Sequence, residues 1–268
     1  MSAPRLDVIV VSFNTREHVT RCLSSLLATP PRGLADLVLV DNASADGTVD
    51  AVRAAWPQVR VIALDRNVGF AAANNVGIRA TGAPLVLLLN SDTVVAPGAI
   101  DALIDRLDVS GATAIGPRLV DASGRPEVSF GRALSPLSEL IQRRRVRLAR
   151  SGRPAARRTV DRWLSRERWV DWVSGACLLV RRDAAVAAGL LDERYFMYEE
   201  DVDFCAALRA QGGRILFTPD VTITHLGGQS ARTAVAATRE HYDRSHLAYY
   251  EKHLPHWAPV LRWWQARR

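Results

Sequence analysis

Residues 85–92 read LVLLLNSD, and this segment decides the fold. Five consecutive apolar residues predict a strand that is buried on both faces, as in a parallel sheet covered by helices. The chain then turns abruptly polar at Asn90, Ser91 and Asp92. Because ligands bind at the carboxyl ends of strands in an open α/β sheet, these three side chains are candidates for ligand binding. A simple polar turn after the strand would look the same.

Strand and helix alternate through the first part of the chain. Strands are expected within residues 8–11, 37–40, 59–64 and 85–89, each followed by a segment with helical periodicity. Ser44 is expected to cap the helix after the second strand. This alternation predicts an α/β fold with a mostly parallel sheet and helices on both of its faces.

The regular pattern breaks after residue 117 and resumes near residue 172. The second half is expected to contain short strands and helices and then a helical tail: a strand over 172–180, helices over 183–188 and 200–210, strands over 215–217 and 221–224, and helix within 234–268.

Composition limits the class of protein and its partners. The chain has 268 residues and is 48% hydrophobic, which is enough for one large domain. Its net charge of +7 favours anionic partners, such as nucleotides, polyprenyl diphosphates, phospholipid surfaces or nucleic acid. Cys22, Cys177 and Cys205 form no CxxC pair, which favours a reducing cytoplasm over a disulfide framework. The N-terminus does not resemble a signal peptide, and no apolar run is long enough to span a membrane, so any membrane contact is expected to be peripheral.

Neither common phosphate-binding loop is present, because no GxGxxG follows the first strand and GxxxxGK[ST] is absent. Other motifs, taken together, resemble family 2 glycosyltransferases over about residues 6–230. They are VVSFN at 10–14, VDNASADGT at 40–48, RNVGFAAAN at 66–74, LNSD at 89–92, SGA at 174–176, FMYEEDVD at 196–203 and His225. Within the family, the motifs most resemble those of bacterial rhamnosyltransferase-like enzymes. The resemblance implies a GT-A fold, a nucleotide-sugar donor and inversion at the anomeric carbon.

The resemblance also implies a domain organisation. Residues 1–230 would form the GT-A catalytic domain, with a nucleotide-binding half over about 1–117. An acceptor-side half would cover about 118–230 and include a basic segment over 143–168. Residues 231–268 would form a C-terminal helical extension.

A divalent metal, Mn²⁺ or Mg²⁺, is the expected cofactor, because a metal neutralises a departing nucleoside diphosphate. Asp92 matches the last residue of the family's DxD motif, while Asn90 stands where its first Asp often stands. The site therefore has one carboxylate fewer than usual. His225 matches a position where a His can complete the metal shell, and a His that caps the end of a strand is the alternative.

Inversion requires a base that takes the proton of the acceptor hydroxyl. Asp201 matches the family's base position, with Glu200 as the neighbouring alternative. Acidic residues are also favoured at the start of any helix by the helix dipole. The catalytic interpretation therefore depends on the order and spacing of this cluster relative to the other motifs.

The remaining resemblance concerns the donor. Asp41 matches the residue that hydrogen-bonds the pyrimidine base, Ser12 and Asn14 would lie near base and ribose, and Arg66 would border the nucleotide. A polar loop would supply similar residues. The donor-binding candidates are polar residues at strand ends and in loops: Ser12, Asn14, Asp41, Arg66, Asn67, Asn74, Asn90, Ser91 and Asp92.

The segment 143–168 contains eleven arginines and two acidic residues, with Trp163, Trp169 and Trp172 within or beside it. One interpretation is a flexible flap that meets anionic lipid head groups or a polyprenyl diphosphate, since Trp favours the membrane interface. The other is a solvated charged surface. Near the C-terminus, Trp257, Trp263 and Trp264 beside arginines suit either an interfacial helix or a packed one.

The expected function is inverting, metal-dependent transfer of one sugar from a nucleotide-sugar donor, dTDP-rhamnose or otherwise a UDP-sugar. The acceptor would be a glycan or a polyprenyl-diphosphate-linked molecule at the inner face of the plasma membrane, in cell-envelope polysaccharide synthesis. A sugar-nucleotide pyrophosphorylase is one alternative, but it should carry a glycine-rich basic loop where residues 12–14 read SFN. A basic nucleic-acid-binding protein is the other, although acidic strand ends would repel phosphates, so no nucleic-acid partner is expected. The oligomeric state is left open.

Overall fold

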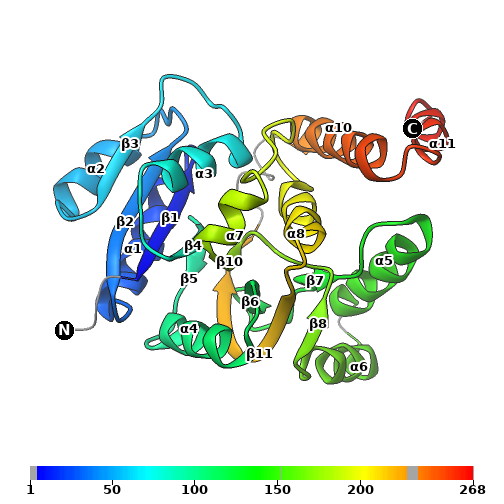
Figure 1. Cartoon of the computed structure of the whole chain (residues 1–268), viewed down its shortest axis with the longest axis horizontal. Helices are drawn as coiled ribbons and strands as arrows, with labels where there is room; N and C mark the ends of the chain where they lie inside the picture. The colour runs from blue at the N-terminus through cyan, green and yellow to red at the C-terminus, as the bar shows by residue number, and fades with distance from the viewer. Residues whose placement is uncertain (1–4, 152, 228–234, 268) are drawn as a thin grey trace.

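The computed structural model describes residues 5–151, 153–227 and 235–267 (Figure 1). Its strands are β1 (Leu6–Ser12), β2 (Leu34–Asp41), β3 (Arg60–Ala63), β4 (Leu85–Asn90), β5 (Thr93–Val94), β6 (Ala114–Val120), β7 (Phe130–Gly131), β8 (Arg168–Val170), β9 (Trp172–Val173), β10 (Cys177–Arg181) and β11 (Ile215–His225). Its helices are α1 (Arg16–Ala28), α2 (Thr48–Ala55), α3 (Phe70–Arg79), α4 (Ala99–Ser110), α5 (Pro136–Arg150), α6 (Pro154–Leu164), α7 (Arg182–Ala187), α8 (Glu200–Ala210), α10 (Val235–His253) and α11 (Ala258–Gln265).

Most strands join one central sheet in the order β3-β2-β1-β4-β10-β6-β11-β5, with β8 pairing on β11. The first four strands are parallel, as predicted. β10 runs antiparallel to both of its neighbours, and β5 and β8 run antiparallel to β11. β6 and β11 pair in parallel, so the sheet is mostly parallel, as predicted, with β10, β5 and β8 as its antiparallel strands. The apolar pattern of a strand predicts its burial but contains no information about its direction.

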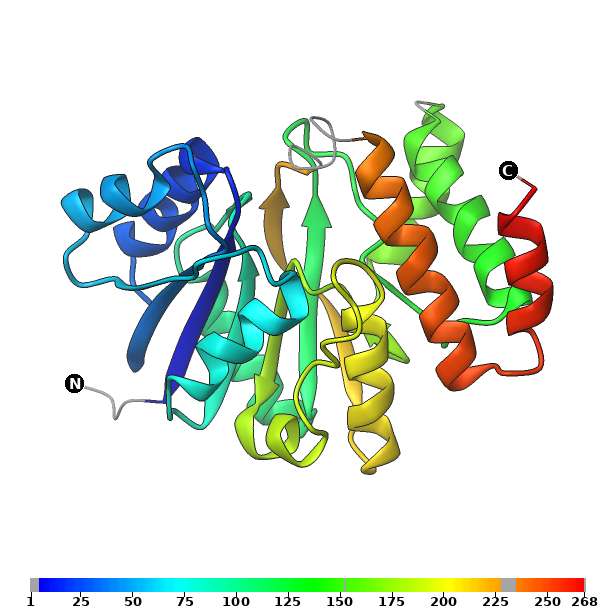
Figure 2. The same ribbon diagram turned by 90° about the horizontal axis from the view of Figure 1, so that it is seen from above.

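Helices cover both faces of the sheet, which confirms the predicted layers (Figure 2). Along β4, Leu85, Leu87 and Leu89 face one core together with α1, α2 and α4. Val86 and Leu88 face the other core together with α3, α7 and α8. The continuous apolar run is needed because alternate side chains of a strand point to opposite faces.

The strands expected at 215–217 and 221–224 form one strand, β11. Its pairing register with β6 shifts between Thr218 and Thr222, around Pro219. Proline has no N–H to donate to a ladder and is tolerated in strands at such irregularities. The proline therefore interrupts the pairing without ending the strand.

The basic segment 143–168 folds as a helical hairpin of α5 and α6 rather than as a flexible flap. Ser135 caps α5, and its Oγ accepts the N–H of Ser138 at 3.2 Å. Val160 and Leu164 of α6 are buried in the core on one face of the sheet. Apolar residues at helical spacing thus anchor a segment whose composition is dominated by charge.

The C-terminal extension is helical, as expected, and consists of α10 and α11. Tyr249, Tyr250 and Ala258 form a third apolar cluster with Tyr195 and Val202. Figures 1 and 2 place α10 and α11 beside α5 at one end of the molecule. The expected boundary at residues 230–231 lies outside the described residues. Among the helices that the structure describes, none has the length and apolar character needed to cross a bilayer.

Candidate active site

A cleft with about 1190 Å³ of empty space, its open mouth included, lies at the carboxyl ends of β1 and β4. This is the edge where the polar strand ends were predicted to bind a ligand. The cleft brings together residues from both halves of the chain that the sequence had singled out: Ser12, Asn67, Asn90, Ser91, Asp92, Glu200, Asp201 and His225.

Four other candidates, Asn14, Asp41, Arg66 and Asn74, are not among the lining residues. Asn74 is buried in α3, where its Nδ2 donates to the carbonyl of Phe70 at 2.9 Å. Asn14 Oδ1 accepts the N–H of Ala45 at 2.8 Å. Arg66 is exposed. Contact of these side chains with a donor remains a prediction.

Asp41 is buried and organises the loop behind the cleft. Its carboxylate accepts hydrogen bonds from the hydroxyls of Ser12 at 2.7 Å and Ser44 at 2.6 Å, and from the N–H of Ser44 at 2.8 Å. The expected capping by Ser44 is therefore wrong, because this side chain binds Asp41 and α2 begins after Gly47. Asp41 reaches the cleft through Ser12, whose side chain lines it.

Asp92 and His225 meet in one corner of the cleft. The short strand β5 pairs with the end of β11, so that Thr93 lies opposite His225. His225 Nε2 lies 3.2 Å from Asp92 Oδ1, and its Nδ1 lies 2.9 Å from Glu127 Oε2. The imidazole is thus held between two carboxylates.

The electrostatics of this corner favour an ion pair. Burial lowers the pKa of His225, but the hydrogen bonds to Asp92 and Glu127 outweigh burial and raise the pKa to about 10. Burial raises the pKa of Asp92, but the hydrogen bond to His225 outweighs it and leaves that pKa below its ordinary value. The ring therefore holds its second proton more tightly than a free imidazole, and a cation that bound through Nε2 would have to displace a proton.

The donors in this corner fit a divalent cation. Within the described part of the chain, Asn90 Oδ1 is a buried oxygen without a hydrogen-bond partner. An amide oxygen, the Asp92 carboxylate and an imidazole are a ligand set that Mn²⁺ and Mg²⁺ accept. The described residues contain no group of three or more His, Cys, Asp and Glu side chains that could hold a metal ion. A cation bound here would therefore need further oxygens from substrate or water.

Glu200 and Asp201 begin α8, as predicted, and follow a strained turn. Tyr198 and Glu199 have φ angles of 71° and 66°, in the left-handed region that residues with a side chain rarely adopt. Each such residue costs of order 1 kcal/mol and persists only where its surroundings enforce it. This backbone conformation orients the start of α8 so that Glu200 and Asp201 both line the cleft.

Backbone amides hold the Asp201 carboxylate in place. Its Oδ2 accepts the N–H of Gly175 at 2.8 Å, and its Oδ1 accepts the N–H of Val202 at 2.8 Å. Burial raises the pKa of Asp201 to about 6, although these amide bonds oppose the shift. Burial and the charge of Asp201 raise the pKa of Glu200 well above its ordinary value. A carboxylate that is a stronger base than usual therefore faces the cleft.

Two residues that build this site were not predicted from the sequence. Asn42 Nδ2 donates to the carbonyl of Gly69 at 3.2 Å, and its Oδ1 accepts the N–H of Val68 at 3.1 Å. Its position directly after Asp41 in the VDNASADGT motif could have identified it. Glu127, the partner of His225, follows no recognisable motif, and only the folded chain brings the two together.

Residues 4–249 match the family described as glycosyltransferase like family 2. The chain belongs to this family. One relative, the N-acetylglucosaminyl-diphospho-decaprenol L-rhamnosyltransferase of Mycobacterium tuberculosis, is 31% identical over 96% of this chain and 88% of its own length. Membership confirms the resemblance and accounts for the shared order of the motifs.

Solved glycosyltransferases share the fold. The mannosyltransferase of Pyrobaculum calidifontis, solved with GDP-Man and Mn²⁺, has a TM-score of 0.64 at 19% identity, over 98% of this chain and 69% of that one. GalNAc-T7, solved with UDP, GalNAc and Mn²⁺, has a TM-score of 0.61 at 17% identity, over 84% of this chain and 44% of that one. These similarities confirm the predicted GT-A fold of the family 2 chain.

Proposed function

We propose that this glycosyltransferase is inverting and metal-dependent, and that it transfers one sugar from a nucleotide-sugar donor to a lipid-linked acceptor. One observation carries the proposal: a carboxylate pair of raised pKa, Glu200 and Asp201, lines the same cleft as the Asp92–His225 corner. The two groups suit the two requirements of the reaction, a base for the acceptor and charge neutralisation for the leaving group.

Asp92, His225 and Asn90 would hold the divalent cation. When bound, the cation would neutralise the charge that develops on the departing nucleoside diphosphate. The Mn²⁺ named with the mannosyltransferase of similar fold supports this part of the proposal.

Asp201 acts on the acceptor. Its carboxylate accepts the proton of the attacking hydroxyl while the hydroxyl oxygen forms a bond to the anomeric carbon. The bond from that carbon to the diphosphate breaks on the opposite face, so the configuration inverts. The amides of Gly175 and Val202 occupy one lone pair on each carboxylate oxygen and leave another free for the proton.

The name of the mycobacterial relative supports a more specific reaction. That protein is named as an L-rhamnosyltransferase acting on a diphospho-decaprenol-linked acceptor, and 31% identity covers nearly all of this chain. We therefore propose dTDP-rhamnose as the donor, with a UDP-sugar as the alternative. The acceptor would be a polyprenyl-diphosphate-linked glycan of the cell envelope.

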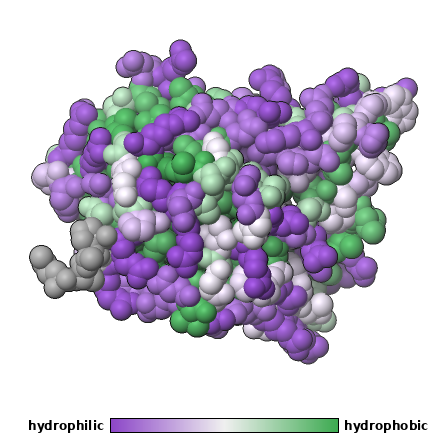
Figure 3. Space-filling view, viewed as in Figure 1, coloured by the Kyte–Doolittle hydropathy of each residue, from purple (hydrophilic) through white to green (hydrophobic). Residues whose placement is uncertain are grey.

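A lipid-linked acceptor requires access to a membrane surface, and the end of the molecule formed by α5, α6 and α11 suits one. Figure 3 shows hydrophilic and hydrophobic side chains interleaved at this end. The exposed apolar residues there include Leu137, Leu140, Ile141, Val260 and Trp263. Arginines surround them, a combination that favours anionic lipid surfaces at the cytoplasmic face.

The test of the proposed function is single-turnover transfer from dTDP-rhamnose to a polyprenyl-diphosphate-linked acceptor, with donor affinity measured alongside. Asp201→Asn should lower transfer by roughly 10²–10⁴-fold, the usual contribution of a general base, with donor affinity nearly unchanged. Glu200→Gln should cost less. Asp50→Asn, which alters an exposed carboxylate on α2, is the control and should transfer at the wild-type rate.

Two results would change the proposal. If Glu200→Gln abolished transfer while Asp201→Asn did not, the base would be Glu200. If both variants transferred at the wild-type rate, the acidic cluster would serve only as the start of a helix and the proposed mechanism would be wrong.

A further inference from the structure

Helix α10 of the C-terminal extension packs against the strained turn that precedes α8, residues 196–199. Each of the four residues from 196 to 199 has its own partner on the helix. The contacts are ring stacking of Phe196 on His241 with centroids 4.5 Å apart, a 2.8 Å hydrogen bond from Ser245 Oγ to the carbonyl of Met197, an edge contact of Tyr198 with Tyr242 at 5.8 Å, and a 3.1 Å contact of Glu199 Oε1 with His246 Nδ1.

The turn needs this support. Tyr198 and Glu199 both have left-handed backbone conformations, which a glycine would adopt without strain but these residues do not. Glu199 immediately precedes the first turn of α8, so its position sets where Glu200 and Asp201 begin. Displacement of a catalytic group by about 1 Å can cost 10²-fold in rate.

His246 is the most enclosed of the four partners. Its side chain is 3% exposed, and its Nε2 lies 3.3 Å from Glu139 Oε2 on α5. Glu139 also accepts a hydrogen bond from Tyr250 on α10. The imidazole therefore lies between a carboxylate of the turn and a carboxylate of the helical hairpin.

The charges around His246 favour one fixed orientation of its imidazole ring. Burial lowers the pKa of His246, but the carboxylates of Glu139 and Glu199 outweigh burial and raise it to about 9. A protonated ring carries an N–H on each nitrogen, so Nδ1 can donate to Glu199, while Nε2 lies near Glu139 without a hydrogen bond to it. Arg143 pairs with Glu139 at 3.0 Å and adds a second cation to the cluster.

We propose that His246 is a positioning residue for the transfer reaction. By fixing Glu199 it holds the turn that presents Glu200 and Asp201 to the acceptor hydroxyl. His246 is not among the residues that line the cleft, so it acts through Glu199 rather than on the substrate. This inference rests on the proposed function, in which the carboxylate pair supplies the base.

The experiment measures single-turnover transfer and donor affinity in His246 variants of the full chain. His246→Ala should lower the transfer rate by about 10- to 100-fold. The donor dissociation constant should stay within about twofold, because the proposed donor contacts come from β1, β4 and the loop at Asn67. His246→Asn should recover part of the rate, since its side-chain amide lies at about the position of the imidazole Nδ1 and can still donate to Glu199.

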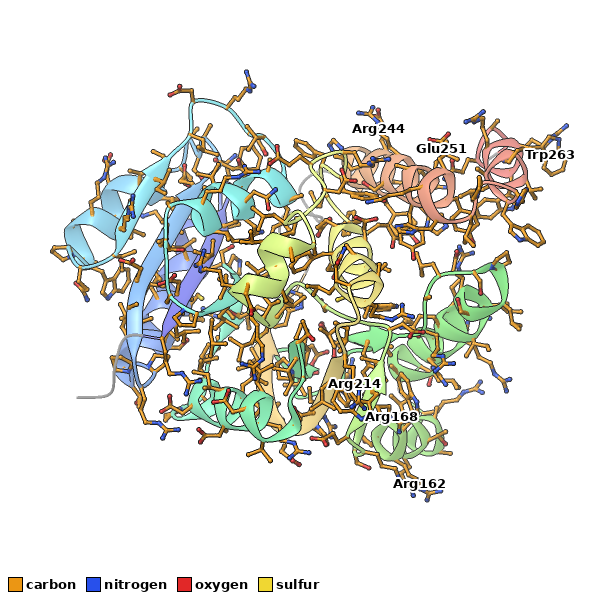
Figure 4. All side chains as sticks on the ribbon, viewed as in Figure 1. Arg162, Arg168, Arg214, Arg244, Glu251 and Trp263 are labelled. Atoms are coloured by element: carbon orange, nitrogen blue, oxygen red, sulfur yellow. The ribbon has the colours of Figure 1, made fainter. Side chains whose placement is uncertain are left out.

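Arg244→Ala is the matched control on the same helix. Arg244 points away from the domain in Figure 4 and pairs with Glu240 one turn earlier, so its loss should change neither rate nor affinity. If His246→Ala does not fold, as judged by circular dichroism, Glu199→Gln tests the same contact. That variant keeps the size of the side chain and removes its charge.

The outcomes separate the positioning role from the proposed base. Wild-type transfer by folded His246→Ala, together with inactive Asp201→Asn, would overturn the positioning role and leave the base intact. Equal losses of donor affinity and transfer in His246→Ala, without recovery in His246→Asn, would also overturn it, since they indicate general damage to the fold. Wild-type transfer by Asp201→Asn would instead overturn the base.

Discussion

His225 Nε2 lies 3.2 Å from Asp92 Oδ1, although the two residues come from opposite halves of the chain. The N–H of Leu226 also donates to the carbonyl of Asp92 at 2.8 Å, so backbone and side chains join at this point. The end of β11 is therefore fixed against the polar residues that follow β4. A ligand that binds Asp92 must also be accommodated by His225.

Asp92→Ala should abolish metal-dependent donor binding, because it removes the only carboxylate among the proposed metal ligands. Calorimetry of the nucleotide-sugar donor with and without Mn²⁺ measures the effect. A loss of at least tenfold in affinity, or about 1.4 kcal/mol, is expected with metal present and little change with chelator. A folded variant that kept the wild-type affinity in Mn²⁺ would show that Asp92 does not bind the metal.

His225→Ala should weaken metal dependence less than Asp92→Ala, because water can replace one ligand. The expected result is a several-fold rise in the Mn²⁺ concentration that gives half-maximal donor binding. An unaltered metal titration would indicate that His225 only ties β11 to the cleft. Circular dichroism of the variant controls for loss of that structural contact.

The pH dependence of transfer should report the base. Asp201 must be ionised to accept a proton, and its pKa is raised to about 6, so the rate should rise with pH through about 6. The profile of kcat/KM for the acceptor measures this in the free enzyme. A rate that was already at its plateau well below pH 5 would contradict the assignment.

Asp201→Asn should remove activity and should gain stability relative to the wild-type protein as pH rises from 4 to 7. Because the folded-state pKa of Asp201 is raised, its ionisation destabilises the fold as pH increases from about 4 toward 6 and remains unfavourable above. The variant avoids this cost, although its Nδ2 cannot accept the N–H that the second carboxylate oxygen accepts. Its stability relative to the wild type should therefore rise by on the order of 1 kcal/mol between pH 4 and pH 7. Below about pH 4, where Asp201 is protonated in both states, the difference should no longer change with pH. Urea unfolding at pH 7 and pH 4 tests the sign.

Gly69→Ala should destabilise the protein by at least about 2 kcal/mol. Gly69 has a φ of 88°, and an added Cβ would lie 2.5 Å from the carbonyl oxygen of Phe196, which accepts the N–H of Phe70 at 2.7 Å. Gly82→Ala is the control, because its Cβ would meet nothing within 4 Å. Equal urea midpoints for the two variants would show that the close approach of the two halves is not required.

Local features of the fold were predictable from the sequence. The run at 85–89 predicted a doubly covered strand, because burial on two faces requires apolar residues at consecutive positions. The acidic cluster at 199–201 predicted the start of α8. The direction of β10 was not predictable, since an antiparallel strand has the same apolar pattern as a parallel one.

Contacts between segments that are distant in the sequence could not be predicted from the apolar pattern either. Glu127 binds His225, and His246 binds Glu199, through tertiary structure alone. Arginines dominate the composition of 143–168, so the sequence predicted either a flexible flap or a solvated charged surface, and not a helical hairpin anchored by the buried Val160 and Leu164. The overall composition of a segment indicates its exposed residues, but it does not show which apolar residues pack into the core.

The outward arginines of the hairpin should bind anionic membranes. Some arginines of this segment have structural roles: Arg145 lies 4.1 Å and Arg168 5.7 Å from the ring centroid of Trp163. The variant to test therefore changes only four exposed arginines to serine: Arg144, Arg147, Arg158 and Arg162. Each arginine near an anionic surface contributes about 1 kcal/mol at low salt, so partitioning should fall by more than tenfold.

Flotation with anionic vesicles at low and at physiological salt measures this binding. The matched control removes the same charge away from α5 and α6 by changing four exposed arginines to serine: Arg21, Arg53, Arg60 and Arg79. Circular dichroism checks that loss of the Arg60 contact with Ala80 and of the Arg79–Glu193 ion pair leaves the fold intact. If net charge alone drove binding, both variants would lose it equally. Loss confined to the hairpin variant would place the membrane surface at α5 and α6, and wild-type flotation by that variant would exclude it. Since the acceptor is proposed to be lipid-linked, the hairpin variant should also lose transfer on vesicles while it retains donor affinity.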